Sequence, residues 1–337
     1  MKQVLVVDDN LTNLRQINLQ LAGEYRAVLA KSGTQALQIC ESERPDLILL
    51  DIEMPEMDGF ETIARFKDNA HTRHIPVIFL TASHDTATEV KALQSGAVDF
   101  IRKPVERCVL LHRINLYIRF FEYQSHLEDT VKALEDCIVA AFSSVVEGRG
   151  ENSEGHVART SQYVAILCGE LQAMKLFPNE LSDSEVRLIV RAAPLHDVGK
   201  IGISDVILLK PGMLNDEEFN IMKRHTTIGA NILKDMLERA PTQHYLKYAI
   251  MTAEFHHERY DGEGYPHGLK GDSIPLCARI MAVADVYDAL VDRRVYKKPL
   301  DHSVACRIIH AGRGTQFDPR VVDAFQSVNH EFDAISK

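Results

Sequence analysis

The first third of the chain alternates short apolar runs with segments of helical spacing, and this alternation limits the folds open to it. The runs are residues 4–7, 26–30, 47–50, 77–80 and 100–101, and each ends in polar residues. A continuous apolar run is typical of a strand buried on both faces of a parallel sheet. Strands that alternate with helices in this way predict a doubly wound α/β domain with a five-stranded parallel sheet.

Polar side chains follow these predicted strands. They are Asp8, Asp9, Asp51, Thr81 and Lys103. In doubly wound sheets the functional site lies beyond the carboxyl ends of the strands. Three carboxylates at one edge would repel one another unless a cation neutralised them, so we expect Mg²⁺ there, held by few protein ligands and several waters. The alternative is the ordinary polar rim of a flavodoxin-like fold.

This half closely resembles the receiver domain of two-component response regulators. The resemblance rests on Asp8-Asp9, Asp51, Met54-Pro55, Asp58-Gly59, Thr81-Ala82 and Lys103-Pro104. It implies that Asp51 accepts a phosphoryl group from a cognate sensor histidine kinase, while Asp8, Asp9 and Asp51 hold Mg²⁺. It also implies that Thr81 and Lys103 contact the phosphoryl oxygens and that Phe100 is the aromatic switch residue. The Lys103–Pro104 bond is expected to be cis.

A long helix is predicted to connect this domain to the rest of the chain. Residues 105–146 contain neither Pro nor Gly. Within them Leu127, Val131, Leu134, Ile138, Ala141 and Val145 follow heptad spacing. A stripe out of phase precedes it at Leu110, Ile114, Tyr117 and Phe121. Two interpretations remain open: a parallel homodimer seam, or intramolecular packing with one stripe on the receiver sheet and the other on the second domain.

The length and composition limit the class of protein. A chain of 337 residues has room for two domains. We place these domains at 1–122 and 151–337, with a helical linker at 123–150. The first helices of the second domain can begin within this linker. A net charge of −10 argues against a partner such as duplex nucleic acid. The six Cys lack CxxC spacing and fit reduced thiols. No stretch is apolar for long enough to span a membrane. We therefore expect a cytoplasmic protein.

The second half is predicted to be all-α. Residues 156–169, 183–198, 216–237, 245–258 and 275–290 have helical spacing, and no alternating strand pattern occurs among them. Helices hold the side chains of a site more rigidly than loops do. We therefore expect a helical domain with its site in the interior, in which His196 and Lys200 lie one turn apart on one helix face.

Histidine and aspartate residues recur through this half. They are His156, His196, Asp197, His225, His256, His257 and Asp285. Any one of them alone is more often an ordinary histidine or aspartate. A structural zinc needs only four ligands, usually including Cys, and no Cys lies among these. Nitrogen and oxygen ligands suit iron, manganese, nickel or zinc in an open catalytic site. Two metal ions can share such a set if one carboxylate bridges them.

The surrounding residues strongly resemble the HD-GYP family of cyclic-dinucleotide phosphodiesterases, part of the HD superfamily. The matching stretches are His196-Asp197-Val198-Gly199-Lys200, Lys210-Pro211-Gly212 and His256 through Pro266. The resemblance implies that the seven residues are the ligands of a binuclear site, with Asp197 bridging. It implies catalytic roles for His196, Asp197 and Lys200. It further implies substrate contacts from Lys200, Gly264, Tyr265, Pro266, Arg294 and Lys297.

Two positions depart from the family pattern. Some relatives bind a third metal through a Glu where this chain has Asn152, although Glu151 and Glu154 lie nearby. Tyr260 replaces a common Trp and keeps an aromatic ring.

The resemblance implies a phosphorylation-regulated, metal-dependent enzyme that opens cyclic di-GMP to pGpG, with further hydrolysis to GMP left open. The metal ions would activate a water, polarise the scissile phosphate and stabilise the leaving oxygen. One alternative is a phosphodiesterase for another cyclic dinucleotide such as cyclic GMP-AMP. The other is a signalling adaptor that binds the dinucleotide with little turnover.

Overall fold

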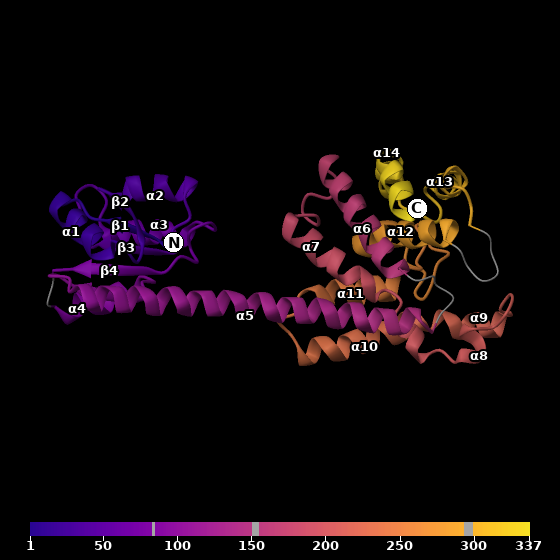
Figure 1. Ribbon diagram of the computed structural model, residues 1–337. Helices are drawn as coiled ribbons and strands as arrows, with labels where there is room; N and C mark the ends of the chain where they lie inside the picture. The colour runs from indigo at the N-terminus through magenta and orange to yellow at the C-terminus, as the bar shows by residue number, and fades with distance from the viewer. Residues whose placement is uncertain (83–84, 150–154, 293–298) are drawn as a thin grey trace. The chain divides into compact units, whose positions relative to one another are not determined.

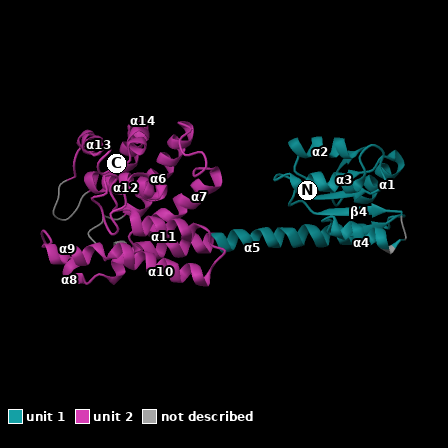
Figure 2. Ribbon diagram, turned by 180° about the vertical axis from the view of Figure 1, so that it is seen from behind, with its two compact units in different colours: residues 1–132 teal, residues 133–337 magenta. Residues whose placement is uncertain are grey.

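The computed structural model describes residues 1–337 apart from 83–84, 150–154 and 293–298. The chain divides into two compact units, residues 1–132 and 133–337 (Figure 2). Among the described residues, none of the helices combines the length and the apolar composition that a membrane crossing requires.

The first unit is built on the predicted parallel sheet. Its strands are β1 (Gln3–Val7), β2 (Arg26–Ala30), β3 (Leu47–Asp51), β4 (Val77–Thr81) and β5 (Asp99–Arg102). All neighbours pair in parallel, in the order β2-β1-β3-β4-β5. The three central strands β1, β3 and β4 are almost wholly buried, which explains their continuous apolar sequence. The doubly wound α/β prediction is confirmed.

Helices cover both faces of this sheet (Figure 1). On one face, α1 (Leu11–Leu21) and the first turns of α5 (Arg107–Glu147) bury a cluster that includes Leu14 and Leu110. On the other, α2 (Gly33–Ser42), α3 (Gly59–Asp68) and α4 (Thr86–Gln94) bury a second cluster that includes Phe66 and Ala92. Because the helices occupy the faces, the carboxyl edge of the strands is left for polar side chains.

The two apolar stripes of α5 differ in burial. Leu110 and Ile114 are fully buried on the receiver sheet, which confirms intramolecular packing for the first stripe. The heptad stripe is exposed in the chain: Leu127, Val131, Leu134, Ile138 and Val145 are 47–63% accessible. Val139 and Val146, which lie between the stripe positions, are buried instead, and Val139 contacts the second unit's core. The intramolecular alternative was therefore wrong for the heptad stripe.

The described part of the second unit is helical, and one isolated bridge between Arg313 and Phe317 is its sole β pairing. Its α-helices after α5 are α6 (His156–Ala173), α7 (Asp183–Ala192), α8 (Asp205–Leu208), α9 (Asp216–Lys223), α10 (His225–Arg239), α11 (Tyr245–Phe255), α12 (Leu276–Val291), α13 (His302–Ala311) and α14 (Pro319–Ser336). The all-α prediction is confirmed.

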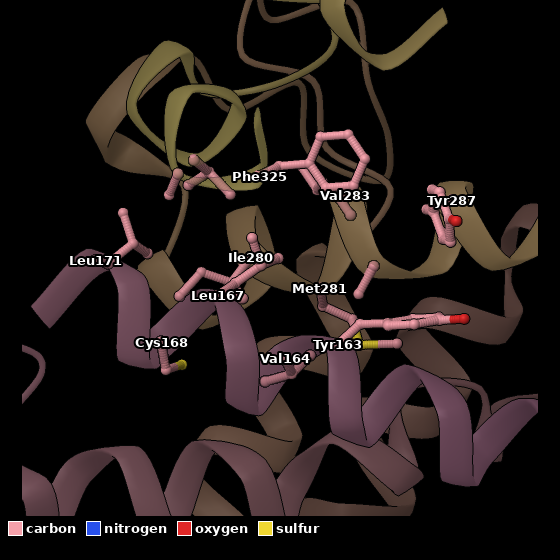
Figure 3. Packing of buried hydrophobic residues seen from close by; sticks show 14 of the residues in the cluster. Tyr163, Val164, Leu167, Cys168, Leu171, Ile280, Met281, Val283, Tyr287 and Phe325 are labelled. Carbon is pink, nitrogen blue, oxygen red and sulfur yellow. The ribbon is translucent and has the colours of Figure 1, made fainter. Parts of the chain in front are cut away.

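The core of this unit lies between α6, α12 and α14. Figure 3 shows side chains of α6, such as Tyr163 and Leu167, among those of α12 and Phe325 of α14. The Tyr163 ring also stacks on Phe332, with centroids 4.3 Å apart. Burying each of these large side chains contributes on the order of 1.5–3 kcal/mol. The packing holds α6 and α12, whose His156 and Asp285 belong to the site, against each other.

Three predicted helices end earlier than expected. Residues 183–198 are not one helix, because α7 ends at Ala192 and two 3-10 turns follow, η1 (Ala193–Leu195) and η2 (Val198–Gly202). Pro194 lies in the break, where its missing N–H prevents the α-helical hydrogen bond. The predicted helix 216–237 is divided at Arg224 into α9 and α10, and the one predicted to reach 258 ends at Phe255. Each break lies next to a histidine of the proposed site.

Candidate metal centre

The seven predicted ligands converge in the second unit. Donor atoms of His156, His196 and Asp285 lie within 4.8 Å of one another, and so do those of His225, His256 and His257. Asp197 lies between the two groups. Its Oδ2 is 3.4 Å from Nε2 of His196, while its Oδ1 is 3.5 Å from Nε2 of His225 and 3.8 Å from Nε2 of His256. One carboxylate thus presents a different oxygen to each group.

Most of these residues lie at helix ends. His156 and His225 are the first residues of α6 and α10, and His256 caps α11. His196 and Asp197 lie between η1 and η2, so His196 and Lys200 do not share one α-helical face as predicted. The breaks at Pro194 and Arg224 therefore turn the chain where ligands are needed. Asp285 alone of the seven lies inside a helix, α12.

A glycine allows the two groups to approach. Gly199 of η2 packs against the start of α10, and a Cβ on it would lie 1.8 Å from the carbonyl oxygen of His225. No side chain can occupy that space without moving backbone. Gly199 therefore sets the separation between Asp197 on η2 and His225 on α10.

The hydrogen bonds of four imidazoles determine which nitrogen is free. Nδ1 of His196, His225 and His256 donates to the backbone carbonyl of Ala193, Met222 and Thr252, at 3.0, 2.7 and 2.9 Å. A carbonyl only accepts, so the proton is on Nδ1 and the lone pair is on Nε2. Nδ1 of His156 is likewise held by Asp288, at 2.8 Å.

The freed nitrogens have no protein partner. Nε2 of His156, His196, His225 and His256, and Oδ1 of Asp197, are buried and make no hydrogen bond within the described part of the chain. Several unpaired acceptors facing one another in a buried space would be costly without a shared cation. This donor set, neutral imidazoles and carboxylates, fits divalent transition metals.

Electrostatics favour the metal-binding protonation states of three imidazoles and of Asp197. For His196, burial opposes the charged form but is outweighed by the carboxylates of Asp197 and Asp285, which raise its pKa. Burial lowers the pKa of His256 to about 3 and also lowers the pKa of His225 and His257. Burial opposes the charged form of Asp197, but the Lys200 ammonium and His196 together hold its pKa well below the usual range. These three imidazoles are therefore neutral and Asp197 is ionised near pH 7, as a metal site requires.

Lys200 lies beside the bridging carboxylate. Its ammonium forms an ion pair with Oδ2 of Asp197, and the side chain is about one fifth exposed. A cation at this position is close enough to contact an anion bound at the centre.

The segment containing Gly264, Tyr265 and Pro266 folds over the centre as a loop. Buried Glu258 anchors it, accepting from the backbone N–H of His267 at 2.7 Å and of Leu269 at 3.0 Å. Gly264 is needed for this path, because a Cβ there would lie 2.3 Å from the backbone nitrogen of Arg259. The ring of Tyr265, which precedes a cis Pro266, stacks on His257 with centroids 4.8 Å apart.

Two residues of this centre were not predicted. Asp288 is fully buried and holds His156, and Arg159 donates from Nε to Asp288 Oδ1 at 2.7 Å. Their spacing from the predicted ligands could have identified them. Asp288 follows Asp285 by one turn of α12, and Arg159 follows His156 by one turn of α6, so each lies on the same helix face as a ligand.

The other predicted positions in this half cannot be placed. Arg294 and Lys297, predicted to bind substrate, lie outside the described residues, as do Glu151, Asn152 and Glu154, the candidates for a third metal.

The predicted receiver residues meet at the carboxyl edge of the sheet. Carboxylate oxygens of Asp8, Asp9 and Asp51 lie within 4.8 Å of one another. Nζ of Lys103 is 2.8 Å from Oδ2 of both Asp8 and Asp51. Burial raises the pKa of Asp51, although Lys103 opposes this shift. The structure thus brings together the buried carboxylates of Asp8 and Asp51, the exposed carboxylate of Asp9 and one ammonium.

The remaining receiver predictions lie nearby in sequence and structure. Thr81 is buried at the end of β4, and Phe100 is half-buried on β5. The Lys103–Pro104 bond is cis, as expected.

Comparison with known proteins agrees with both halves. The response regulator receiver domain family matches residues 4–115, and the HD domain family matches residues 142–321. A probable cyclic di-GMP phosphodiesterase of Vibrio cholerae is 42% identical over 99% of this chain and 79% of its own length. The cyclic di-GMP phosphodiesterase response regulator RpfG of Xanthomonas campestris is 38% identical over 95% of this chain and 86% of its own.

A third relative is named for a different substrate. The 3'3'-cGAMP-specific phosphodiesterase 2 of Vibrio cholerae is 36% identical over 67% of this chain and 40% of its own length. The alignments with the first two of these relatives span both matched regions of this chain, the receiver and the HD domain. The chain therefore belongs to the HD-GYP response regulators, which join a receiver domain to a metal-dependent phosphodiesterase domain.

Proposed function

We propose that this response regulator hydrolyses cyclic di-GMP to linear pGpG and that phosphorylation of Asp51 controls the reaction. The observation that carries the proposal is the position of Asp197, whose two oxygens face two separate groups of buried, unpaired imidazole nitrogens. The names of the relatives that match nearly the whole chain support cyclic di-GMP as the substrate. Further hydrolysis of pGpG to GMP would be a second reaction at the same centre.

The proposed centre holds two ions of iron, manganese, nickel or zinc. His156, His196 and Asp285 would hold one ion, His225, His256 and His257 the other, and Asp197 would bridge them. When bound, such a pair supplies an activated water and Lewis-acid stabilisation of charge on the phosphodiester. The Nδ1 hydrogen bonds fix the imidazoles so that each lone pair faces the centre.

The chain's own cations act on the substrate. Lys200, now paired with Asp197, lies where it can also contact a phosphodiester oxygen and offset the charge that grows in the transition state. Family resemblance supports the same role for Arg294 and Lys297. Tyr265, held over His257 by its loop, would contact the dinucleotide beside the reacting phosphate.

The receiver half would act as the switch. We propose that Asp8, Asp9 and Asp51 hold Mg²⁺ while Asp51 accepts a phosphoryl group from a sensor histidine kinase. Lys103 and Thr81 would then bind the phosphoryl oxygens. The exposed heptad stripe of α5 supports a homodimer with a parallel helical seam.

Two other functions remain candidates. Hydrolysis of another cyclic dinucleotide, such as cyclic GMP-AMP, has the weaker support of similarity to a cGAMP-specific relative over 67% of this chain. An adaptor that binds the dinucleotide with little turnover would need no complete ligand set, whereas all seven ligands are present here.

The test is turnover of a panel of cyclic dinucleotides by protein reconstituted with each metal. We expect cyclic di-GMP to be opened with the highest kcat/KM. The double variant His196→Ala, Asp197→Ala should lose both metal, measured by elemental analysis, and activity, while the receiver stays folded. Unchanged metal content and activity in this variant would contradict the assignment of the centre.

A further inference from the structure

A surface of two aromatic rings and one ammonium extends from the metal centre to α9. Its members are Tyr265, Phe219 and Lys223. The family resemblance implies a substrate contact for Tyr265 and has given no role to Phe219 or Lys223. At the inner end, Tyr265 stacks on the proposed ligand His257 with centroids 4.8 Å apart and an interplanar angle of 27°. Burial, followed by the nearby carboxylates Asp197 and Asp285, raises the pKa of the Tyr265 phenol. The ring of Tyr265 therefore forms part of the wall of the centre.

At the outer end, Phe219 meets Tyr265 edge to face, with centroids 6.1 Å apart and planes at 82°. Phe219 belongs to α9, a helix in which no residue is buried, and its own side chain is 44% exposed. A ring that served only to fasten α9 to the loop would be expected to bury nearly all of its surface. Phe219 instead keeps an accessible surface beside the centre.

Lys223 lies one turn further along α9. Its Nζ is 4.9 Å from the centroid of Phe219 and 5.8 Å from that of Tyr265, within the range of cation–π attraction. Among the described residues, no carboxylate forms an ion pair with Lys223. The two rings thus hold an ammonium whose charge is not already neutralised.

The position of this ammonium relative to the metals is fixed by the backbone. Lys223 ends α9, and the proposed ligand His225 begins α10 two residues later. The imidazole of His225 is itself bonded to the carbonyl of Met222, in the last turn of α9. Movement of Lys223 away from the centre would therefore disturb a ligand.

A cyclic dinucleotide has the features that this surface would recognise. It carries two phosphates, of which only one can lie at the metals during a given cleavage, and the other keeps its negative charge. It also carries two purine bases, whose faces stack on aromatic rings with little dependence on sequence. A single aromatic ring separates Lys223 from the ligand His257, so a second phosphate beside the reacting one can reach the ammonium.

We propose that Phe219, Lys223 and Tyr265 form a substrate subsite in which Lys223 binds the phosphate that is not being cleaved and Phe219 stacks on one purine base. This inference rests on the proposed function and deepens it, because it names the residues that distinguish a cyclic dinucleotide from a simple phosphodiester. Lys223 and Phe219 are binding residues in this account and take no part in bond cleavage.

The test separates binding from chemistry. Lys223→Gln and Phe219→Leu would be compared with the parent and with two controls at exposed neighbouring positions, Arg224→Gln and Ile221→Ala. The first measurement is the Kd of the metal-loaded proteins for a hydrolysis-resistant phosphorothioate analogue of cyclic di-GMP. The second is steady-state kinetics with cyclic di-GMP and with bis(p-nitrophenyl) phosphate, which has one phosphodiester and no base. Elemental analysis monitors metal content.

We expect the Kd and the KM for the dinucleotide to rise about tenfold in each subsite variant, the scale of one lost base stack or charged contact. The kcat for cyclic di-GMP, the kinetics with bis(p-nitrophenyl) phosphate and the metal content should stay as in the parent, and the controls should match the parent throughout. If the subsite variants bind the analogue as the parent does, the subsite is wrong and the proposed function stands. If the parent itself neither binds nor hydrolyses cyclic di-GMP but cleaves bis(p-nitrophenyl) phosphate, both proposals fail.

Discussion

The Nδ1 atom of His156 lies 2.8 Å from Oδ2 of Asp288, a carboxylate with no exposed surface. Arg159 donates to the same carboxylate through Nε and through a terminal nitrogen, at 2.7 and 2.8 Å. Asp288, itself held by Arg159, fixes the ring of His156. The Nε2 atom of His156 then faces Oδ1 of Asp285, 3.6 Å away. A carboxylate behind an imidazole orients the ring and makes it a stronger ligand, as in many metal sites.

Asp288→Asn should therefore weaken metal binding while leaving the set of metal ligands intact. The amide keeps the shape and one acceptor but loses the charge, so we expect metal affinity to fall roughly 10- to 100-fold. Competition with a chelator of known affinity measures this. Asp333→Asn, which removes a surface carboxylate paired with Lys337, is the control. Equal metal affinity in Asp288→Asn and the parent would show that Asp288 only fills space.

Gly199→Ala tests the close approach of η2 to α10. The new methyl would lie 1.8 Å from the carbonyl oxygen of His225, so one of the two backbones must move. We expect loss of metal from the pure protein and a decrease of about 1–3 kcal/mol in the free energy of unfolding, the usual cost of overpacking. Both are measured on the same preparation, by elemental analysis and by urea unfolding.

Gly169→Ala is the matched control, because no atom lies within 4 Å of a Cβ at that position of α6. It should stabilise the helix by roughly 0.5–1 kcal/mol and leave metal content unchanged. A Gly199→Ala protein that binds metal like the parent would exclude a role for this contact.

The sequence was most informative where one physical rule acts locally. A strand buried on both faces has to be apolar, so residues 47–50 and 77–80 could be assigned without a structure, and the ends of such strands have to share an edge. The ligands of the metal centre could be grouped for a different reason: each alone would be an ordinary histidine or aspartate, but the motifs around them resemble those of a known family. This is why Asp51 and Lys103, and His156 and Asp285, could be grouped although they are far apart in the chain.

The sequence was least informative where a helix end, the exposure of a side chain or the role of a residue depends on a residue that is distant in the chain but close in space. Pro194 was a visible signal for the break after α7, since it cannot continue the helical hydrogen bonds. Arg224 gave no such signal, and the start of α10 directly after it packs closely against Gly199, far from it in sequence. The exposed stripe of α5 could not be separated from its buried neighbours, because Leu134 and Val139 are both apolar and the helix has apolar residues on more than one face. Asp288 was missed because its role depends on His156, 132 residues away.

A buried ion pair should make the second unit sensitive to acid. Asp318 and Arg279, 1% and 5% exposed, are joined at 2.5 Å, and Arg320 donates to the same carboxylate. Burial opposes the charged form of Asp318, but the two arginines outweigh it and lower its pKa. The folded pKa is thus below the unfolded value of about 3.9, so the pair stabilises the fold above about pH 4, and this stabilisation is lost as the pH falls through the folded pKa.

Asp318→Asn should therefore lower the free energy of unfolding by about 3 kcal/mol at pH 7, since it leaves buried Arg279 without its charged partner. The difference from the parent should shrink as the pH falls below about 4, where the parent's carboxyl also loses its charge. Urea unfolding across this pH range measures both effects. The surface pair of Asp323 with Arg313 provides the comparison, and Asp323→Asn should change the free energy of unfolding far less than Asp318→Asn at pH 7, because solvent screens an exposed pair. A constant difference for Asp318→Asn at every pH would contradict the ion-pair account.

The exposed heptad stripe of α5 leads to a prediction about how phosphorylation controls turnover. Phosphorylation is a local change of charge and needs an element with two arrangements to act at a distance. We expect phosphorylated Asp51 to bind Thr81, reorient Phe100 and change how two copies associate through Leu127, Val131, Leu134 and Ile138. Beryllium fluoride, which mimics the phosphoryl group, should therefore change both the dimerisation and the turnover of the parent. Asp51→Asn should abolish that response.

Leu134→Asp places a charge in the stripe, where Leu134 is 59% exposed in the single chain, so the monomer should fold normally. Ala133→Asp adds the same charge at the adjacent exposed position, off the stripe, and is the matched control. We expect Leu134→Asp to lose the response to beryllium fluoride in both sedimentation and turnover, while Ala133→Asp keeps it. A full response in Leu134→Asp would mean that coupling does not pass through this stripe, and no response in the parent would mean that association does not control activity.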